Sequence, residues 1–293
     1  MKVYIASSEK YAGLIKEDIY IRDKYNSNGF SSKIATLSDI VNESKFGDLV
    51  ILKSVWGYNL DYKTFLNQIK HLEGKGVKLM NDYQYIFWNI DKSKYLFEIK
   101  DCIVIPTYKL IFNKVKTQAD ISDYINSSTS VEWGNEIVIK PTISASGYLT
   151  FYYNLSDKSH NNIVLSSLYD NKEIEFIVQP YRKSISKGEI SVIMLNGDVL
   201  YAVNRFPGIF ISKKDTEYIK FVDIPKNIMM QVKNIQKFFI DKFNSYPNIC
   251  RIDFVQFKDE YEILEIELID PDLFFKNIPQ EMLLKCLENL CDT

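Results

Sequence analysis

The chain has 293 residues, of which 46% are hydrophobic and 25% are charged, values typical of a globular protein rather than a disordered one. Its formal net charge of −2 creates no basic field, so we expect neither nucleic acid nor an anionic membrane as a partner. The length is enough for two domains, or for one elaborate domain with a sizeable core.

Several common catalytic and nucleotide-binding signatures are absent from the sequence. Only His71 and His160 occur, which argues against a histidine-rich metal site or a histidine-based triad. Neither G-x-x-x-x-G-K-[ST] nor G-x-G-x-x-G is present. No apolar stretch reaches the roughly 20 residues of a membrane helix. The cysteines contain no C-x-x-C pair and are expected to be reduced thiols of a cytoplasmic protein: Cys102, Cys250, Cys286 and Cys291.

The first 85 residues alternate between strand and helix patterns, in the order strand, helix, strand, helix, strand. Short apolar runs at 2–7 and 48–54 are typical of parallel strands. Residues 61–76 have helical spacing and end at two glycines suited to a C-cap. Residues 77–81 supply a third strand. The alternation predicts an open α/β domain.

The rest of the chain changes to a pattern of antiparallel strands and helices. Hairpins are predicted at 188–208, around Asn196-Gly197, and at 250–270. Further extended segments are predicted at 104–111, 135–141, 148–154 and 174–181. Helices are predicted at 89–101, 117–128, 226–243 and 279–291. We find no internal repeat and no flexible linker.

The second hairpin carries two carboxylates in the largely apolar segment "LEIELID". Glu265 and Glu267 are two residues apart and therefore point to the same face of a strand. If the turn occupies residues 258–260, Asp253 lies opposite Glu265 and Arg251 lies opposite Glu267. Three carboxylates on one face suit Mg²⁺, which prefers oxygen ligands.

Two conditions limit this interpretation of the hairpin. A register slip of one residue would send the acids of the two strands to opposite faces. An exposed sheet face, with Arg251 paired to Glu267, is the alternative to a metal site. Asp270 points to the other face if the strand continues, so we leave it out of the site.

Two lysines and one strand end are candidates for nucleotide contact. Lys140 ends an apolar strand, and the small residues that follow it, up to Gly147, let backbone N–H groups approach phosphate oxygens. Lys92 lies within the predicted helix 89–101. The strand that ends at Gln179 would leave backbone groups free for a base edge. Each segment also fits an ordinary role, as a surface turn, a solvated helix residue or a core strand.

In chain order these segments resemble the ATP-grasp superfamily of carboxylate–amine ligases, nearest to the group around the cyclisation ligase of cycloserine biosynthesis. That group also has a tryptophan–x–tyrosine element like Trp56-Gly57-Tyr58. The matching series is NIDK (89–92), VIKP (138–141), a small-residue loop (142–147), IVQPY (177–181), GEIS (188–191), AVNRFP (202–207), RIDFV (251–255) and LEIELIDP (264–271).

The resemblance implies an α/β N-terminal domain with an open parallel sheet, residues 1–88, that contributes to substrate binding. An α+β ATP-grasp module with antiparallel sheets follows, residues 89–293. Its lid subdomain is expected near residues 105–180, and its metal-binding and catalytic subdomain near residues 181–293. The loop 142–150 would close over ATP.

The resemblance also assigns roles by position. Mg²⁺ ligands would be Asp253, Glu265 and Glu267. Arg205 and Arg251 would steady phosphate or acyl-phosphate oxygens during catalysis. Nucleotide contacts would come from Lys92, Lys140, Ser144, Ser146, Gly147, Val178, Gln179, Tyr181 and Glu189.

The implied activity is an ATP- and Mg²⁺-dependent ligation, with one or two ions and Mn²⁺ as a substitute. A carboxylate becomes an acyl phosphate and is coupled to an amine-type nucleophile of a small metabolite or peptide. The alternatives are a nucleotide-binding protein without ligase activity and a tailoring ligase for a ribosomal precursor peptide. The sequence also leaves open whether the protein forms a homodimer.

Several positions depart from the family pattern, so substrate identity is not implied. Glu267 stands where asparagine is common, and Gln179 stands where glutamate is common. Lys53 and Gly57 replace an expected arginine and aspartate, and the lid has the sequence Ser-Ala-Ser-Gly instead of a glycine-rich one. The pair Trp56 and Tyr58 is expected in the N-terminal core, with the acceptor pocket as the alternative.

Overall fold

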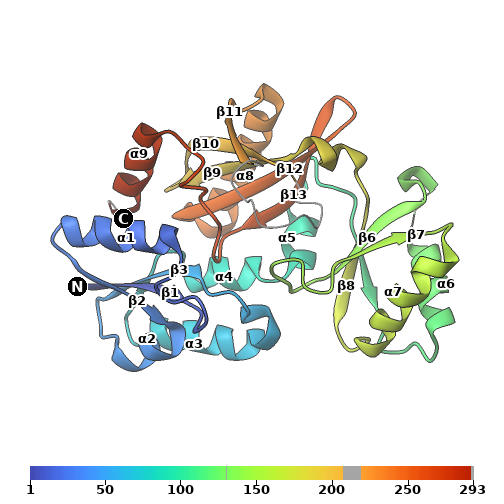
Figure 1. Ribbon diagram of the computed structural model, residues 1–293, viewed down its shortest axis with the longest axis horizontal. Helices are drawn as coiled ribbons and strands as arrows, with labels where there is room; N and C mark the ends of the chain where they lie inside the picture. Colours follow the sequence, from blue (N-terminus) through green and yellow to red (C-terminus); the bar gives the residue numbers. More distant parts are fainter. Residues whose placement is uncertain (130, 207–218, 292–293) are drawn as a thin grey trace.

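Three β-sheets organise the residues that this computed structural model describes, 1–129, 131–206 and 219–291. A parallel N-terminal sheet lies beside a larger antiparallel C-terminal sheet, and a central antiparallel sheet forms a lobe of its own at the right of Figure 1. This arrangement confirms the predicted fold class of a parallel α/β region followed by antiparallel α+β structure. In the described residues, no helix is both long and apolar enough to cross a membrane.

The N-terminal sheet has the strand order β2-β1-β3-β4. Its strands are β1 (Lys2–Ser7), β2 (Ser31–Thr36), β3 (Leu49–Ser54) and β4 (Lys78–Leu79). Its helices are α1 (Lys16–Ser27), α2 (Leu37–Glu43) and α3 (Tyr62–Gly74), the last preceded by the 3-10 turn η1 (Tyr58–Asp61). The sequence pattern did not predict β2. This edge strand buries only Ala35 fully, so it lacks the apolar run that marks its neighbours.

The central sheet has the strand order β5-β8-β6-β7 and is covered by two helices. Its strands are β5 (Tyr108–Ile111), β6 (Glu136–Pro141), β7 (Phe151–Asn154) and β8 (Glu175–Pro180). The remaining elements here are α6 (Gln118–Ser128), η2 (Val131–Trp133) and α7 (Lys158–Asp170). The helix α7 was not predicted, because serine and asparagine interrupt its apolar spacing.

The C-terminal sheet has the order β11-β10-β9-β12-β13, with every neighbouring pair antiparallel. Its strands are β9 (Glu189–Leu195), β10 (Asp198–Arg205), β11 (Ile219–Val222), β12 (Ile249–Phe257) and β13 (Glu260–Glu267), and η3 (Lys183–Lys187) precedes them. Its first hairpin turns at Asn196 and Gly197, both with positive φ, as predicted. Residues 207 and 208 of the predicted hairpin segment lie outside the described residues.

Helices cover both faces of the C-terminal sheet. One face packs against α4 (Tyr83–Asn89), α5 (Lys92–Glu98) and α8 (Lys226–Phe243). The other face shares a core with β1, β3, α1 and α9 (Gln280–Cys291), so the N-terminal and C-terminal sheets are joined through common apolar contacts. Figure 1 shows α9 above α1 and beside this sheet.

The β12–β13 hairpin has the register that the metal hypothesis requires, but it reaches this register differently from the prediction. The turn contains two residues, Lys258 and Asp259, since Phe257 pairs with Glu260. Lys258 takes a φ of 55°, which closes the shorter turn. A bulge beside Asp253 restores the pairing of Asp253 with Glu265, and Arg251 pairs with Glu267.

Candidate active site

A cavity of about 530 Å³ lies between the central and C-terminal sheets and reaches α4, α5 and the N-terminal region. We call it the active-site cavity. The predicted site residues that line it are Lys92, Lys140, Ser144, Ser146, Gly147, Gln179, Tyr181, Glu189, Arg205, Arg251, Asp253, Glu265 and Glu267. Residues from segments far apart in the sequence are thus brought together, while their individual roles stay predictions.

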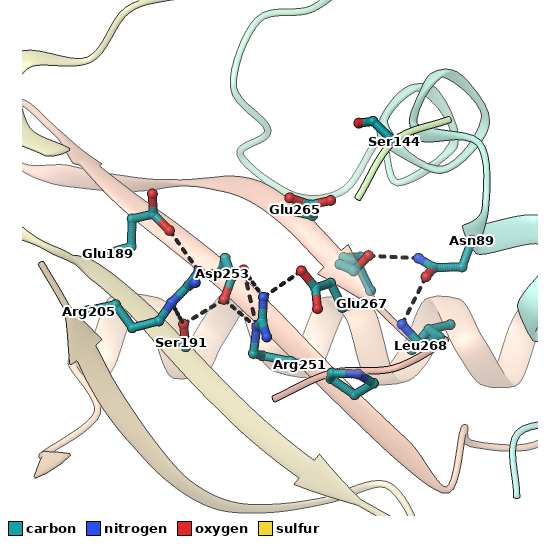
Figure 2. A network of polar contacts seen from close by, with 12 residues as sticks. Asn89, Ser144, Glu189, Ser191, Arg205, Arg251, Asp253, Glu265, Glu267 and Leu268 are labelled. Carbon is teal, nitrogen blue, oxygen red and sulfur yellow. Dashed lines mark hydrogen bonds and ion pairs between the residues drawn. The ribbon is translucent and has the colours of Figure 1, made fainter. Parts of the chain in front are cut away.

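Three carboxylates form the centre of the site. One oxygen from each of Asp253, Glu265 and Glu267 lies within 4.8 Å of the others, and these side chains extend from β12 and β13 toward the same space (Figure 2). The paired strands explain the convergence, because residues opposite each other on one face have neighbouring Cβ atoms. Carboxylate oxygens are hard ligands, so this donor set fits Mg²⁺.

Asp253 lies between two arginines (Figure 2). Arg251 donates from Nε to Oδ1 and from Nη2 to Oδ2, both at 3.0 Å. Arg205 donates to Oδ2 at 2.8 Å. Burial by itself would raise the pKa of Asp253, but Arg205 and Arg251 outweigh it and hold this pKa below its usual value. Asp253 is therefore ionised at neutral pH.

The two glutamates of β13 differ in their electrostatic surroundings. Burial raises the pKa of Glu267 to about 7. The attraction of Arg251 lowers this pKa, whereas repulsion from Glu265 and Asp253 raises it further. Burial also acts on Glu265, but Lys92 and Lys140 overcome it and lower its pKa. Like charges so close together favour binding of a cation.

Lys92 and Lys140 enter the cavity from different elements. Lys92 is the first residue of α5, and its Nζ lies 3.0 Å from Glu265 Oε1. Lys140 is near the end of β6 and is 9% exposed. Burial lowers the pKa of Lys140 against the attraction of Glu265. Both ammonium groups lie where they can neutralise an anionic ligand such as a phosphate.

The loop after β6 is attached to the start of α5. Thr142 O accepts from Lys92 N at 2.8 Å, and Ser144 O accepts from Lys92 Nζ at 2.9 Å. Ser146 and Gly147 have φ values of 51° and 72°, so two successive residues take the left-handed conformation. This conformation is unusual for serine and common for glycine, and it turns the loop along the cavity wall.

The strand predicted to hold adenine through its backbone, β8, ends at the cavity wall, and the adenine contact stays a prediction. Gln179 and Tyr181 line the cavity, and Gln179 Nε2 donates to Thr107 Oγ1 at 2.9 Å. Val178 does not line it: its side chain is fully buried in the core of the central sheet. Val178 also pairs with Tyr108 on β5 and Ile139 on β6, because β8 lies between these strands.

Glu189 has a partner within the protein. Its Oε2 accepts from Arg205 Nη2 at 2.7 Å, and its pKa is raised by burial in spite of this arginine. The carboxylate and Arg205 together form the edge of the polar network in Figure 2. The suggested contact with a ribose stays a prediction.

Sequence reasoning missed three polar residues of this region. Ser191 donates to Asp253 Oδ1 at 2.6 Å and accepts from Arg205 Nε at 2.8 Å, so it orients both. Asn89 donates to Ile266 O and accepts from Leu268 N, which fixes the end of β13 (Figure 2). Asp270 lines the cavity because β13 ends at Glu267, and the expected alternation of faces stops there. Asn89 and Ser191 lie within the motifs NIDK and GEIS, so these motifs could have pointed to both residues.

Trp56 lies on the cavity wall and not in the N-terminal core where we expected it, since it follows the end of β3. It is 39% exposed and lines the cavity together with Tyr58. Tyr58 also packs against the core of the N-terminal sheet. Gly57 has a φ of 98°, which explains a glycine at this turn.

Comparison with known proteins provides independent tests of the fold. The family model described as "Prokaryotic glutathione synthetase, ATP-grasp domain" matches residues 107–215. No curated protein matches the chain. The crystal structure of D-cycloserine synthetase DcsG superposes with a TM-score of 0.81 at 17% identity, covering 100% of this chain and 99% of that chain.

Two further structures agree with this result. D-alanine–D-alanine ligase from Bacillus anthracis gives a TM-score of 0.68 at 14% identity, covering 100% of this chain and 97% of that chain. The ATP-grasp ligase PsnB, complexed with minimal precursor, Mg and ADP, gives 0.61 at 11% identity, with coverages of 99% and 98%.

The chain has the ATP-grasp fold. This confirms the resemblance that the ordered motifs carried. The ATP-grasp fold explains why the lysines, the hairpin acids and the loop after β6 border one cavity although they are distant in sequence. At 11–17% identity the similarity concerns the fold and does not extend to substrates.

Proposed function

We propose that the protein is an ATP- and Mg²⁺-dependent ligase that couples a carboxylate to an amine-type nucleophile. The observation that carries this proposal is the meeting of three carboxylates with Lys92 and Lys140 in one cavity. A carboxylate set of this kind suits Mg²⁺, and buried lysines suit phosphate oxygens. The ATP-grasp fold and the ligases that share it support the same activity.

The proposed reaction has two steps. A substrate carboxylate oxygen bonds to the γ-phosphorus of ATP while the bond to the β-phosphate oxygen breaks, giving an acyl phosphate and ADP. The amine nitrogen then bonds to the acyl carbon, phosphate leaves, and the nitrogen loses a proton. Neither step needs a covalent bond to the protein, so positioning and charge neutralisation suffice.

The residues of the cavity have distinct proposed tasks in these steps. Asp253, Glu265 and Glu267 would hold Mg²⁺, which when bound neutralises phosphate charge. Lys92 and Lys140 would bind phosphate oxygens, and Arg205 and Arg251 would stabilise the negative charge that develops during transfer. Ser191 would keep Asp253 and Arg205 in place through its two hydrogen bonds.

A second candidate function is nucleotide binding without ligation. It is favoured by the ion pairs of Asp253, since both Arg205 and Arg251 already contact this carboxylate. In that case the acids would form a structural network and would not serve as metal ligands.

The test is to incubate the protein with ATP, Mg²⁺ and pairs from a panel of amino acids, and to measure ADP, phosphate and coupled products by mass spectrometry. The ligase proposal expects release of ADP and phosphate that depends on Mg²⁺ and on a pair of substrates. If ATP binds but no panel member promotes ADP release, the second candidate is favoured. If ATP does not bind even with Mg²⁺, both are wrong.

A further inference from the structure

A second cavity of about 510 Å³ lies between the N-terminal helix α1 and the segment that follows β13. We call it the acidic cavity, because its wall includes Glu17, Asp18, Asp270 and Asp272. Trp56, Asp270 and Asp272 line both this cavity and the active-site cavity, so the two adjoin. A small molecule in the acidic cavity would therefore lie next to the active-site cavity.

The lysines that line this cavity either form an ion pair within the protein or have exposed side chains. Lys53 pairs with Glu17 at 2.6 Å and also donates to Pro271 O. Glu17 in turn accepts from backbone N–H groups of the segment after β13. Lys16 and Lys276 are exposed side chains. The pair of Glu17 and Lys53 is thus satisfied within the protein.

Two carboxylates of the acidic cavity are only partly satisfied. Asp18 is fully buried, and its Oδ2 accepts from Ser54 Oγ. Within the described part of the chain, Asp18 Oδ1 and Asp270 Oδ2 are buried and have no hydrogen-bond partner. Burial raises the pKa of both groups, and a cation bound beside them would favour their carboxylate forms again. A buried acceptor without a donor is costly, so each oxygen is a place where a ligand donor would be stabilised.

The arrangement fits an ammonium group better than a metal ion. In the described ranges of the chain, the carboxylates that converge closely enough for a metal are those of Asp253, Glu265 and Glu267, and not those of Asp18 and Asp270. An ammonium group has three donors and no acceptor, which complements separated acceptor oxygens. The ring of Trp56, on the wall shared by both cavities, offers a cation–π surface.

We propose that the acidic cavity binds the amine co-substrate through its ammonium group, with Asp18 and Asp270 as hydrogen-bond acceptors and Trp56 beside it. The chemical class is a primary amine that is protonated in solution, such as an amino acid or a diamine. This inference rests on the proposed ligase function, because that function supplies the need for an amine next to the nucleotide. The bound ammonium group gives one proton to water before its nitrogen attacks the acyl phosphate.

The experiment is ligand-observed NMR on the full chain, with Mg²⁺ and a non-hydrolysable ATP analogue present. The probes are the common L-amino acids, D-alanine and 1,4-diaminobutane, compared with propionate and butane-1,4-diol, which lack the ammonium group. At least one ammonium probe is expected to bind, and its counterpart without the ammonium group is expected not to bind. Asp18→Asn and Asp270→Asn should each weaken that binding at least tenfold.

Asp23→Asn is the matched control, since Asp23 is an exposed residue of the same helix as Asp18 and should leave binding unchanged. Thermal melting of each variant checks folding. If an asparagine variant does not fold, Trp56→Leu serves as the replacement, because Trp56 is part-exposed, and it should also weaken binding.

Binding of no ammonium probe would overturn the inference. Equal binding of the counterparts, or undiminished binding in both asparagine variants, would overturn it as well. Binding of the ATP analogue is measured in the same samples. If an amine binds and the ATP analogue does not, the ligase proposal is wrong and the ammonium site stands. If the ATP analogue binds and no amine does, only the ammonium site is wrong.

Discussion

Lys92, at the start of α5, pairs with Glu265, on β13, across the active-site cavity with 3.0 Å between Nζ and Oε1. The same ammonium group donates to Ser144 O at 2.9 Å. One side chain therefore links the carboxylate cluster to the loop after β6. An anionic ligand that competes for Lys92 would act on both contacts at once.

Replacement of Lys92 should weaken nucleotide binding and loosen this loop. Lys92→Met removes a buried charge that suits phosphate and the donor to Ser144 O, so we expect ATP-analogue affinity to fall roughly tenfold or more. Cleavage of loop 142–150 in limited proteolysis should become faster. Lys94→Met, at an exposed position of the same helix, is the control. Unchanged affinity in Lys92→Met would contradict a phosphate contact.

The double variant Glu265→Gln, Glu267→Gln tests the metal assignment. It keeps side-chain size and removes two anionic ligands, so Mg²⁺-dependent ADP release should fall on the order of a hundredfold or more. Both side chains are partly exposed, so cooperative thermal unfolding should persist. Glu260→Gln, exposed on the same strand, should behave like the wild type. A double variant that remains active would show that these acids do not bind the metal.

The Mg²⁺ requirement should depend on pH near neutrality. Burial raises the pKa of Glu267 to about 7, so this carboxyl group is increasingly protonated as the pH falls below 7. A protonated carboxyl group is a poor metal ligand, and the Mg²⁺ concentration for half-maximal activity should rise toward low pH, by up to about tenfold per pH unit. Measurement between pH 5.5 and 8.5 checks this, and Glu267→Gln should flatten the profile. An equally steep profile in that variant would assign the effect to another group.

The carboxylate cluster could be predicted because strand alternation and hairpin pairing depend on local sequence. Glu265 and Glu267 share a face, and Asp253 lies opposite Glu265, as expected. The turn length was wrong by one residue, and the bulge next to Asp253 compensated for it. Pairing rules alone do not determine a bulge, because it depends on how both strands pack on the rest of the sheet.

Other features depend on tertiary contacts that no local pattern contains. Val178 and its neighbours were expected to hold adenine through the backbone; the side chain of Val178 is buried because β8 is an inner strand of the central sheet, and the backbone contact stays a prediction. Asp270 was left out because the strand was extended too far in the prediction. The acidic cavity lies between α1 and the segment after β13. Residues more than 250 positions apart in sequence are in contact here, for example through the hydrogen bond from Leu273 N to Glu17. Only the folded chain shows this proximity.

The buried pair of Glu17 and Lys53 should couple the stability of the N-terminal sheet to the C-terminal segment. Glu17 accepts from Leu273 N and Phe275 N, and Lys53 donates to Pro271 O. Lys53→Met removes the cation beside Glu17, whose pKa burial already raises to about 7, so Glu17 should take up a proton and the free energy of unfolding should fall by at most about 3–5 kcal/mol. Glu17→Gln leaves a buried ammonium unpaired and should cost a similar amount.

The double variant Glu17→Gln, Lys53→Met should cost less than the sum of the two single changes, because it removes both charges together. Urea denaturation of the wild type, the two single variants and the double variant gives the coupling free energy directly. Glu9→Gln, at an exposed position of the same N-terminal region, serves as the control for a simple loss of charge. Additive costs in the double variant would mean that the pair contributes no coupling, and that the backbone contacts of Glu17 and the shared apolar core attach the C-terminal segment to α1.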